Sequence, residues 1–412
     1  MMNSLTENRK VCCIIANPGY GLGGHYRSLK TIVEALRERV ECVVINIGPY
    51  NSPVIDSIPV TVHNIRFKGL NIVGAVRQVV KILKRERIDA INVFDARIFC
   101  IADMASRIAG KPLVLTKCGG PNPDGSYFFP VVDYLVVFSK ENLEYFQSHP
   151  KYANTEMRFL PNRATKAVPD PVQIEKLRAR LDPRKKTFLI IARFHEHYKD
   201  NMMQGVNLVR RLNGEGKASQ LLIIGTPDAP AVVDEVARYR DDSVIVVNDE
   251  EFTLDASKLI DVADFSIATG RGFMEAASRG KPLLTSLADS PFPLLVTEET
   301  FPELFATNFS PRNRIENLDL EENHRRIARA LEDDGYRAEL SDLASRLFNE
   351  HFDVTSVVGE YQALFSAMRY KRRLRLLTLL HGICSTLREF APFWLPFGLH
   401  EWLLRFRKRW RS

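Results

Sequence analysis

The sequence has few cysteines and no long apolar run. Six cysteines are spread over 412 residues, without CxxC spacing or an even secreted-domain framework, which favours a reducing, cytoplasmic compartment. The apolar run over residues 11–16 is too short for a signal peptide. The run over residues 390–399 is about half of the ~20 residues that a spanning helix needs, and it contains prolines. We therefore expect neither a signal peptide nor a transmembrane helix.

Two nucleotide-binding motifs are also missing. The glycine-rich segment 17–27 lies between an expected strand and an expected helix. It does not fit GxGxxG with an acidic residue about 20 positions later, and no GK[ST] follows as in Walker A. These absences disfavour an NAD or ATP site.

The body of the chain has no net positive charge, whereas the end of the chain has a large one. The formal net charge is +7, from 57 Lys+Arg against 50 Asp+Glu. Residues 369–412 hold eleven basic and two acidic residues, a net of +9, which leaves −2 for residues 1–368. Nucleic acid is therefore disfavoured as a partner of the body, and the C-terminal segment is the part that suits an anionic surface.

The chain does contain two successive series of short β-branched runs that alternate with helix-period segments, a pattern typical of parallel sheets with crossover helices. In the first series we expect strands at residues 11–16, 43–47, 90–94, 112–116 and 134–138. In the second series we expect strands at residues 187–192, 220–224, 243–247, 264–267 and 281–285. The expected fold class is α/β, with two Rossmann-like doubly wound domains that face a central ligand cleft at the carboxyl ends of their strands.

The same pattern gives expected domain limits. Residues 1–165 and 187–350 are expected to form the two domains, and the proline-rich segment 166–186 a linker with a short helix. Residues 351–368 are expected to form a helix that closes the second domain, followed by a basic amphipathic tail at 369–412.

Three strand-to-helix turns carry residue types that suit anions. Gly23 and Gly24 allow backbone N–H groups to approach a phosphate at a helix N-terminus. Arg193 follows a strand and Lys199 begins the next helical run, and such a pair suits a diphosphate. Glu275 is predicted in the first turn of a helix, where it could cap the helix or hold a ribose diol. From the residues alone, the structural alternatives remain open. The glycines could serve only to turn the chain, the two cations could lie in a solvated charged loop, and Glu275 could be a simple helix cap.

Taken in order, these segments resemble the retaining glycosyltransferases of family 4, which have the GT-B fold. The resemblance covers about residues 10–368. It rests on Gly-Gly-x-x-Arg at 23–27, Leu-Pro-Asn at 160–162, Arg193 with Lys199, the strand before Gly225, and Phe-Met-Glu-Ala-Ala-Ser-Arg-Gly-Lys-Pro at 273–282. It implies transfer of a sugar from a UDP- or GDP-sugar with retention of configuration, without a metal or other cofactor.

The resemblance also implies residue roles. Arg193 and Lys199 would neutralise the departing diphosphate, where charge develops in the transition state, and Glu275 would bind the ribose. The base would lie near Val247 and Asn248. The implied donor-binding residues are Gly23, Gly24, Gly225, Val247, Asn248, Gly270, Arg271, Gly272 and Phe273.

Two departures from the family pattern are visible. The glutamate that usually contacts the donor sugar is replaced by Ile267, and the turn is shortened to residues 269–272. Its backbone amides would then hold the sugar, or Arg271 would recognise an acidic or acceptor group. A histidine that often follows the fourth strand of the first domain is also absent. The candidates on the acceptor side are therefore His25, Asp95 and Cys118. A catalytically silent GT-B binding protein remains the alternative.

The tail forms a second element. Apolar residues recur at helical spacing over 374–387 and 399–410, and the tail as a whole holds all three tryptophans together with its basic residues. This favours an interfacial membrane helix, at about 1 kcal/mol per basic residue near anionic lipid. A helix packed on the body, a partner-binding helix and a nucleic-acid tail are the alternatives. The expected membrane residues are Arg372, Arg373, Trp394, Trp402, Arg405, Arg407 and Trp410.

Placement at a membrane suggests the acceptor. A transferase docked on a bilayer is expected to act on a lipid-linked glycan, as in polysaccharide, O-antigen or lipopolysaccharide-type assembly. The expected location is the cytoplasm, in peripheral association with the inner face of the cytoplasmic membrane.

Overall fold

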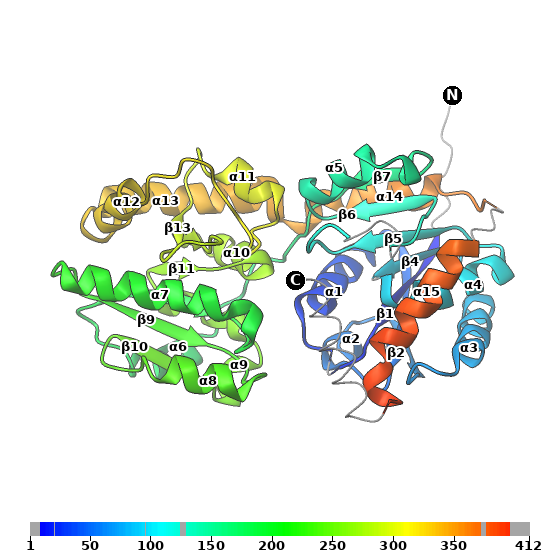
Figure 1. Cartoon of the computed structure of the whole chain (residues 1–412), viewed down its shortest axis with the longest axis horizontal. Helices are drawn as coiled ribbons and strands as arrows, with labels where there is room; N and C mark the ends of the chain where they lie inside the picture. Colours follow the sequence, from blue (N-terminus) through cyan, green and yellow to red (C-terminus); the bar gives the residue numbers. More distant parts are fainter. Residues whose placement is uncertain (1–8, 20, 95, 124–128, 372–375, 396–412) are drawn as a thin grey trace. The chain divides into compact units, whose positions relative to one another are not determined.

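The computed structural model describes residues 9–19, 21–94, 96–123, 129–371 and 376–395 (Figure 1). The described chain forms two compact units. Unit 1 contains residues up to 160 together with those from 354 onward, and unit 2 contains residues 161–353. Each unit is built around its own sheet, so the expected α/β class with two doubly wound domains is confirmed.

Unit 1 contains a seven-stranded parallel sheet in the order β3-β2-β1-β4-β5-β6-β7. The central strands are buried on both faces, as is typical of parallel sheets, and this explains their unbroken apolar runs. The strands are β1 Lys10–Ala16, β2 Glu41–Gly48, β3 Thr61–Arg66, β4 Ala90–Phe94, β5 Leu113–Lys117, β6 Tyr134–Val137 and β7 Glu156–Phe159. The helices include α1 Gly24–Leu36, α2 Pro53–Asp56, α3 Ile72–Arg85, α4 Phe99–Ala109, α5 Lys140–Ser148, α14 Val358–Ala367 and α15 Leu376–Glu389.

Unit 2 contains a six-stranded sheet in the order β10-β9-β8-β11-β12-β13, parallel except for the β12–β13 pair. Its strands are β8 Lys186–Ile191, β9 Ser219–Ile224, β10 Val244–Val247, β11 Phe265–Ile267, β12 Leu283–Thr285 and β13 Leu294–Leu295. Its helices include α6 Pro171–Arg178, α7 Glu196–Gly214, α8 Pro230–Ala237, α9 Glu250–Thr253, α10 Gly270–Ala277, α11 Phe301–Ala306, α12 Leu320–Glu332 and α13 Asp334–Leu347.

Two expected domain limits are wrong. The segment 354–368 does not close the second domain, because α14 buries Tyr361, Leu364 and Phe365 in the core of unit 1, against residues of α1. The segment 166–186 is not a separate linker either, because Ile174 and Leu177 of α6 lie in the core of unit 2. The chain passes between the units at residues 160–161 and 353–354.

The described part of the tail is helix α15, which packs on unit 1. It contacts α4 and the turn at residues 96–98 (Figure 1), and Leu379 and Ile383 lie against the core that α3 and α4 also cover. Within the described ranges, no helix is both long enough and apolar enough to cross a bilayer.

Candidate functional site

The loops that follow β8, β9, β10 and β11 leave the sheet of unit 2 at its carboxyl edge. These strands are neighbours in the sheet, so the loops lie side by side. Main-chain hydrogen bonds join them: Phe194 N donates to Thr226 O at 2.9 Å, and Gly225 N donates to Val247 O at 3.1 Å. In doubly wound sheets this edge is where ligands bind.

Gly225 is required by a close approach of two loops. A Cβ atom at this position would lie 1.8 Å from the carbonyl oxygen of Ala192, closer than any side chain allows. The glycine therefore lets the loop after β9 cross directly over the end of β8, beside Arg193.

Arg193 is held at this edge by an acidic and an aromatic neighbour. Its Nη1 atom donates to Oδ2 of Asp228 at 3.1 Å, and its guanidinium lies over the ring of Tyr198 at 5.7 Å. The side chain is 46% exposed, so its remaining donors can reach a ligand. Asp228 comes from the neighbouring loop, three residues after Gly225.

Lys199 lies in the first turn of α7, a helix of 19 residues. His195 caps this helix, with its Nδ1 atom accepting from the backbone N–H of His197 at 3.2 Å. The Lys199 ammonium lies 3.3 Å from Glu235 and 3.7 Å from Glu196. The hydrogen bond and charge of Glu235 raise the pKa of Lys199 above its ordinary value. Two side-chain cations thus meet the positive end of a helix dipole, an arrangement that attracts an anion.

The expected place of Glu275 in a first helical turn is wrong. Helix α10 begins at Gly270, so Glu275 is its sixth residue and does not cap it. Its carboxylate instead accepts from Nε of Arg271 at 2.7 Å, four residues earlier, and both side chains are largely buried, at 16% and 13% exposure. Arg271 also donates through Nη1 to the carbonyl oxygen of Arg163 at 3.2 Å.

Not every expected donor-binding residue has a side chain that is exposed to a ligand. Phe273 is fully buried and stacks on Phe309 with ring centroids 3.8 Å apart, which leaves only its backbone for a donor. Val247 is also buried, which leaves its backbone. Asn248 is exposed at the end of β10. Gly270 and Gly272 have no atom closer than 4.0 Å to an added Cβ, so this turn offers open backbone.

The expected unit 1 residues lie at the carboxyl edge of the first sheet. Gly23 precedes α1, and Gly24 begins it with open space at its Cα. His25 is half-buried, and its ring packs on Tyr26 at 4.0 Å. Cys118 follows β5 and is partly buried against the core. Asp95 lies outside the described residues. Of the expected membrane residues, only Trp394 is described, and it follows α15. The others lie outside the described residues: Arg372, Arg373, Trp402, Arg405, Arg407 and Trp410.

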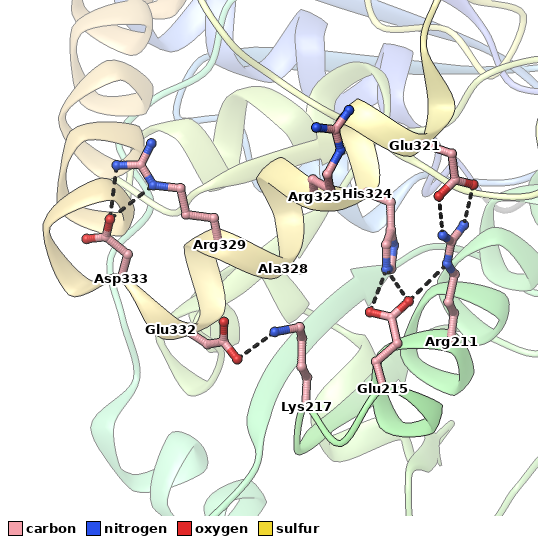
Figure 2. Close-up of a pocket in the computed structure, with 10 residues that line it drawn as sticks. All are labelled: Arg211, Glu215, Lys217, Glu321, His324, Arg325, Ala328, Arg329, Glu332 and Asp333. Atoms are coloured by element: carbon pink, nitrogen blue, oxygen red, sulfur yellow. Dashed lines mark hydrogen bonds and ion pairs between the residues drawn. The ribbon is translucent and has the colours of Figure 1, made fainter.

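A pocket of about 590 Å³ in unit 2 lies elsewhere (Figure 2). Lys217, which lines it, precedes β9, so the pocket is at the amino edge of the sheet. Its charges neutralise one another: Arg211 donates to Glu321 at 3.1 Å, and His324 Nε2 lies 2.8 Å from Glu215, whose pKa it lowers. This pocket is an ion-pair network on the surface, distinct from the loops around Arg193.

Comparison with known proteins points to one fold. No family model matches the sequence, and no curated protein matches it. Solved structures do match. A glycosyltransferase from Rickettsia africae ESF-5 aligns with a TM-score of 0.64 at 12% identity, over 86% of this chain and 98% of that one. The fold is GT-B.

Two further GT-B structures extend the comparison. Alr3699/HepE from Anabaena, in complex with UDP-glucose, aligns with a TM-score of 0.61 at 16% identity, over 86% of this chain and 99% of that one. Sucrose-phosphate synthase from Thermosynechococcus elongatus aligns with a TM-score of 0.59 at 15% identity, over 87% and 100%. At these identities the likeness concerns the fold alone.

Reasoning from the sequence missed the acidic residues that pair with the two cations. Asp228 and Glu235 lie 35 and 36 residues after their partners. The position of Asp228 in the sequence could have indicated its role. Asp228 comes shortly after a predicted strand and Gly225, and that strand is the neighbour of the one that ends before Arg193.

Proposed function

We propose that the chain is a glycosyltransferase of family 4 that transfers a sugar from a nucleoside diphosphate sugar to an acceptor glycan with retention of configuration. The observation that carries this proposal is the pair of cations at the carboxyl edge of unit 2, Arg193 and Lys199, each held by its own carboxylate. A GT-B structure with UDP-glucose bound is consistent with such a donor.

In this proposal the diphosphate replaces the carboxylates as the partner of the cations. It would accept hydrogen bonds from Arg193 and Lys199, while Glu275 holds the ribose and exposed Asn248 lies beside the base. The bond between the anomeric carbon and the diphosphate oxygen breaks, and the acceptor hydroxyl bonds to that carbon on the same face. Its proton passes to the leaving diphosphate, whose growing charge the two cations stabilise.

The proposed acceptor is lipid-linked and lies at the inner face of the cytoplasmic membrane. Two features support it: the net charge of +9 over residues 369–412 and the presence of all three tryptophans there. Unit 1 would bind this acceptor, with His25 and Cys118 among the side chains that lie beside it.

A panel of UDP- and GDP-sugars, with nucleotide release as the readout, tests the proposal. We expect release from at least one donor, and a loss of about 10²–10³-fold in Arg193→Ala, the scale of removing one transition-state donor. Arg210→Ala is the matched control, because Arg210 pairs with Asp241 at 3.6 Å and lies over Tyr239 at 5.0 Å, with 48% exposure, at the other end of α7. Full activity in Arg193→Ala would contradict the assignment.

The second candidate is a GT-B protein that binds a nucleotide sugar without transferring it. It is favoured by Ile267, which is fully buried where the family places its sugar-binding glutamate, and by the engagement of Glu275 with Arg271. A thermal shift with UDP or GDP, together with no nucleotide release from any donor of the panel, would establish this candidate instead.

A further inference from the structure

Helix α15 packs on unit 1 through small and polar residues together with the partly buried Leu379 and Ile383. Thr378, Gly382 and Thr386 are the buried positions, one turn apart. A Cβ on Gly382 would lie 3.0 Å from Cβ of Cys100, and Oγ1 of Thr386 donates to the carbonyl oxygen of Arg97 at 2.5 Å. The seam between α15 and unit 1 is therefore narrow and fixed by a hydrogen bond.

Three other large apolar side chains of α15 are exposed instead of packed on unit 1. Leu376, Leu377 and Leu380 are 58%, 70% and 48% exposed, and Cys384 is exposed on the same side. A helix that only packs on its own domain buries such residues and exposes its polar ones. Single exposed leucines are ordinary, but three within five residues form a patch, and patches mark interaction sites.

A second group of exposed apolar residues lies on the body of unit 1, near the other end of α15. The ring of Phe390 packs on Phe67 at 4.9 Å, and a Cβ on Gly69 would lie 2.7 Å from Cβ of Phe390. The segment that begins α3 therefore adjoins the end of α15. Leu70 and Val73 of that segment are 65% and 56% exposed. We call Leu70, Val73, Leu376, Leu377, Leu380 and Cys384 the leucine surface.

Charge decides between the possible occupants of the leucine surface. Residues 369–375 carry five basic and no acidic side chains, and residues 396–412 carry five basic and one acidic. Along the sequence, the exposed leucines of α15 therefore lie between segments of net +5 and +4, a composition that complements a surface that is apolar inside and anionic outside. A second copy of the chain would bring like charges together and is disfavoured on that ground.

We propose that the leucine surface docks on a bilayer that contains anionic lipid. The side chains enter the headgroup boundary, while basic residues that precede and follow α15 in the sequence bind lipid phosphates. This inference rests on the membrane part of the proposed function and deepens it, because it makes unit 1 itself, and not only the tail, the body that is held at the bilayer.

Flotation of the full chain with equimolar phosphatidylcholine–phosphatidylglycerol vesicles tests the proposal. We expect the wild type to float and Leu376→Ser/Leu377→Ser/Leu380→Ser to lose about tenfold or more in partitioning. The matched control is Val168→Ser/Val172→Ser/Leu254→Ser, which removes exposed apolar residues of unit 2 (72%, 66% and 65%) and is expected to float like the wild type.

The possible results distinguish a bilayer from a second copy of the chain as the partner of the leucine surface. Equal flotation of the leucine variant and the wild type overturns the proposal. A change in oligomeric state by sedimentation, without a change in flotation, overturns it in favour of a second copy. If the triple variant fails to fold, Leu377→Ser alone decides, with a loss of a few-fold expected. UDP binding is measured on the same variants: its absence in all of them would refute the proposed donor site while leaving the flotation result intact.

Discussion

The two units share one frame and differ in what their loops carry. Both sheets place their first strand beside the second on one side and the fourth on the other. In both, a glycine at the carboxyl end of the second strand passes close to the residue after the first: a Cβ on Gly48, the last residue of β2, would lie 1.8 Å from Asn17 O, and one on Gly225, directly after β9, 1.8 Å from Ala192 O.

The likeness extends to the helices that follow the first strands. Helix α1 begins Gly-His-Tyr-Arg at residues 24–27, and α7 begins Glu-His-Tyr-Lys at residues 196–199. The preceding loops differ: glycines dominate the one before α1, whereas Arg193 and its partner Asp228 lie beside α7. The same frame therefore carries two different loops, and it is the charged loop of unit 2 that the proposed function assigns to the donor.

The largest expected effect tests the shared frame. Gly48→Ala and Gly225→Ala should each lower the free energy of unfolding by more than about 3 kcal/mol, because a carbonyl oxygen occupies the place of the new Cβ. Gly214→Ala is the control, since no atom lies within 4 Å of its Cβ. Urea denaturation measures all three. If only one of the two substitutions lowered the free energy of unfolding, the two glycines would not have the same structural role in the two units.

A second prediction concerns the cations at equivalent helix positions. Lys199→Ala should weaken UDP binding by about tenfold, because a charge-assisted contact to the diphosphate is lost. Arg27→Ala should change it by less than about twofold, since UDP belongs to unit 2 in the proposed function. Calorimetric titration with UDP measures both affinities. Equal losses would remove the distinction between the donor unit and its counterpart.

The smallest expected effect concerns His197 of α7 and its counterpart His25 of α1. Loss of solvent and the positive charges of His195, Arg193 and Arg312 lower the pKa of His197, so it is neutral at pH 7. A bound diphosphate favours the protonated ring and raises this pKa. UDP affinity should therefore increase a few-fold as pH falls from about 7.5 to about 6.

His197→Gln should flatten that pH dependence, whereas His25→Gln, at the equivalent position of α1, should leave it unchanged. Affinities measured by calorimetry at several pH values give the comparison. A pH dependence that survives in His197→Gln would assign the titrating group to another residue.

The sequence was informative where burial dictates residue type. The central strands β1 and β8 were found because both their faces are covered, which demands continuous apolar runs. Edge strand β3, Thr-Val-His-Asn-Ile-Arg, is half-exposed and carries no such run, so it was missed. Periodicity found the apolar face of the segment that forms α14, but periodicity does not say which core that face joins.

The same limit applies to the site. Arg193 and Lys199 were selected because they follow a strand, whereas Glu275 was selected for an expected first helical turn that α10 does not place there. The pairing of Arg271 with Glu275 is a contact four residues apart within one helix, and it becomes visible only when α10 is known to begin at Gly270. Asp228 depended on the order of the strands, which puts the loops after β8 and β9 together.

The double passage of the chain between the units has a consequence for biosynthesis. Unit 2 is one continuous segment, 161–353, inserted into unit 1, whose last helices come from the end of the chain. At about 5–20 residues per second, the ribosome completes unit 2 before α14 exists. Until then, the partners of Tyr361 and Phe365 on α1 and its sheet stay uncovered. The first domain to be synthesised is thus the last to be finished.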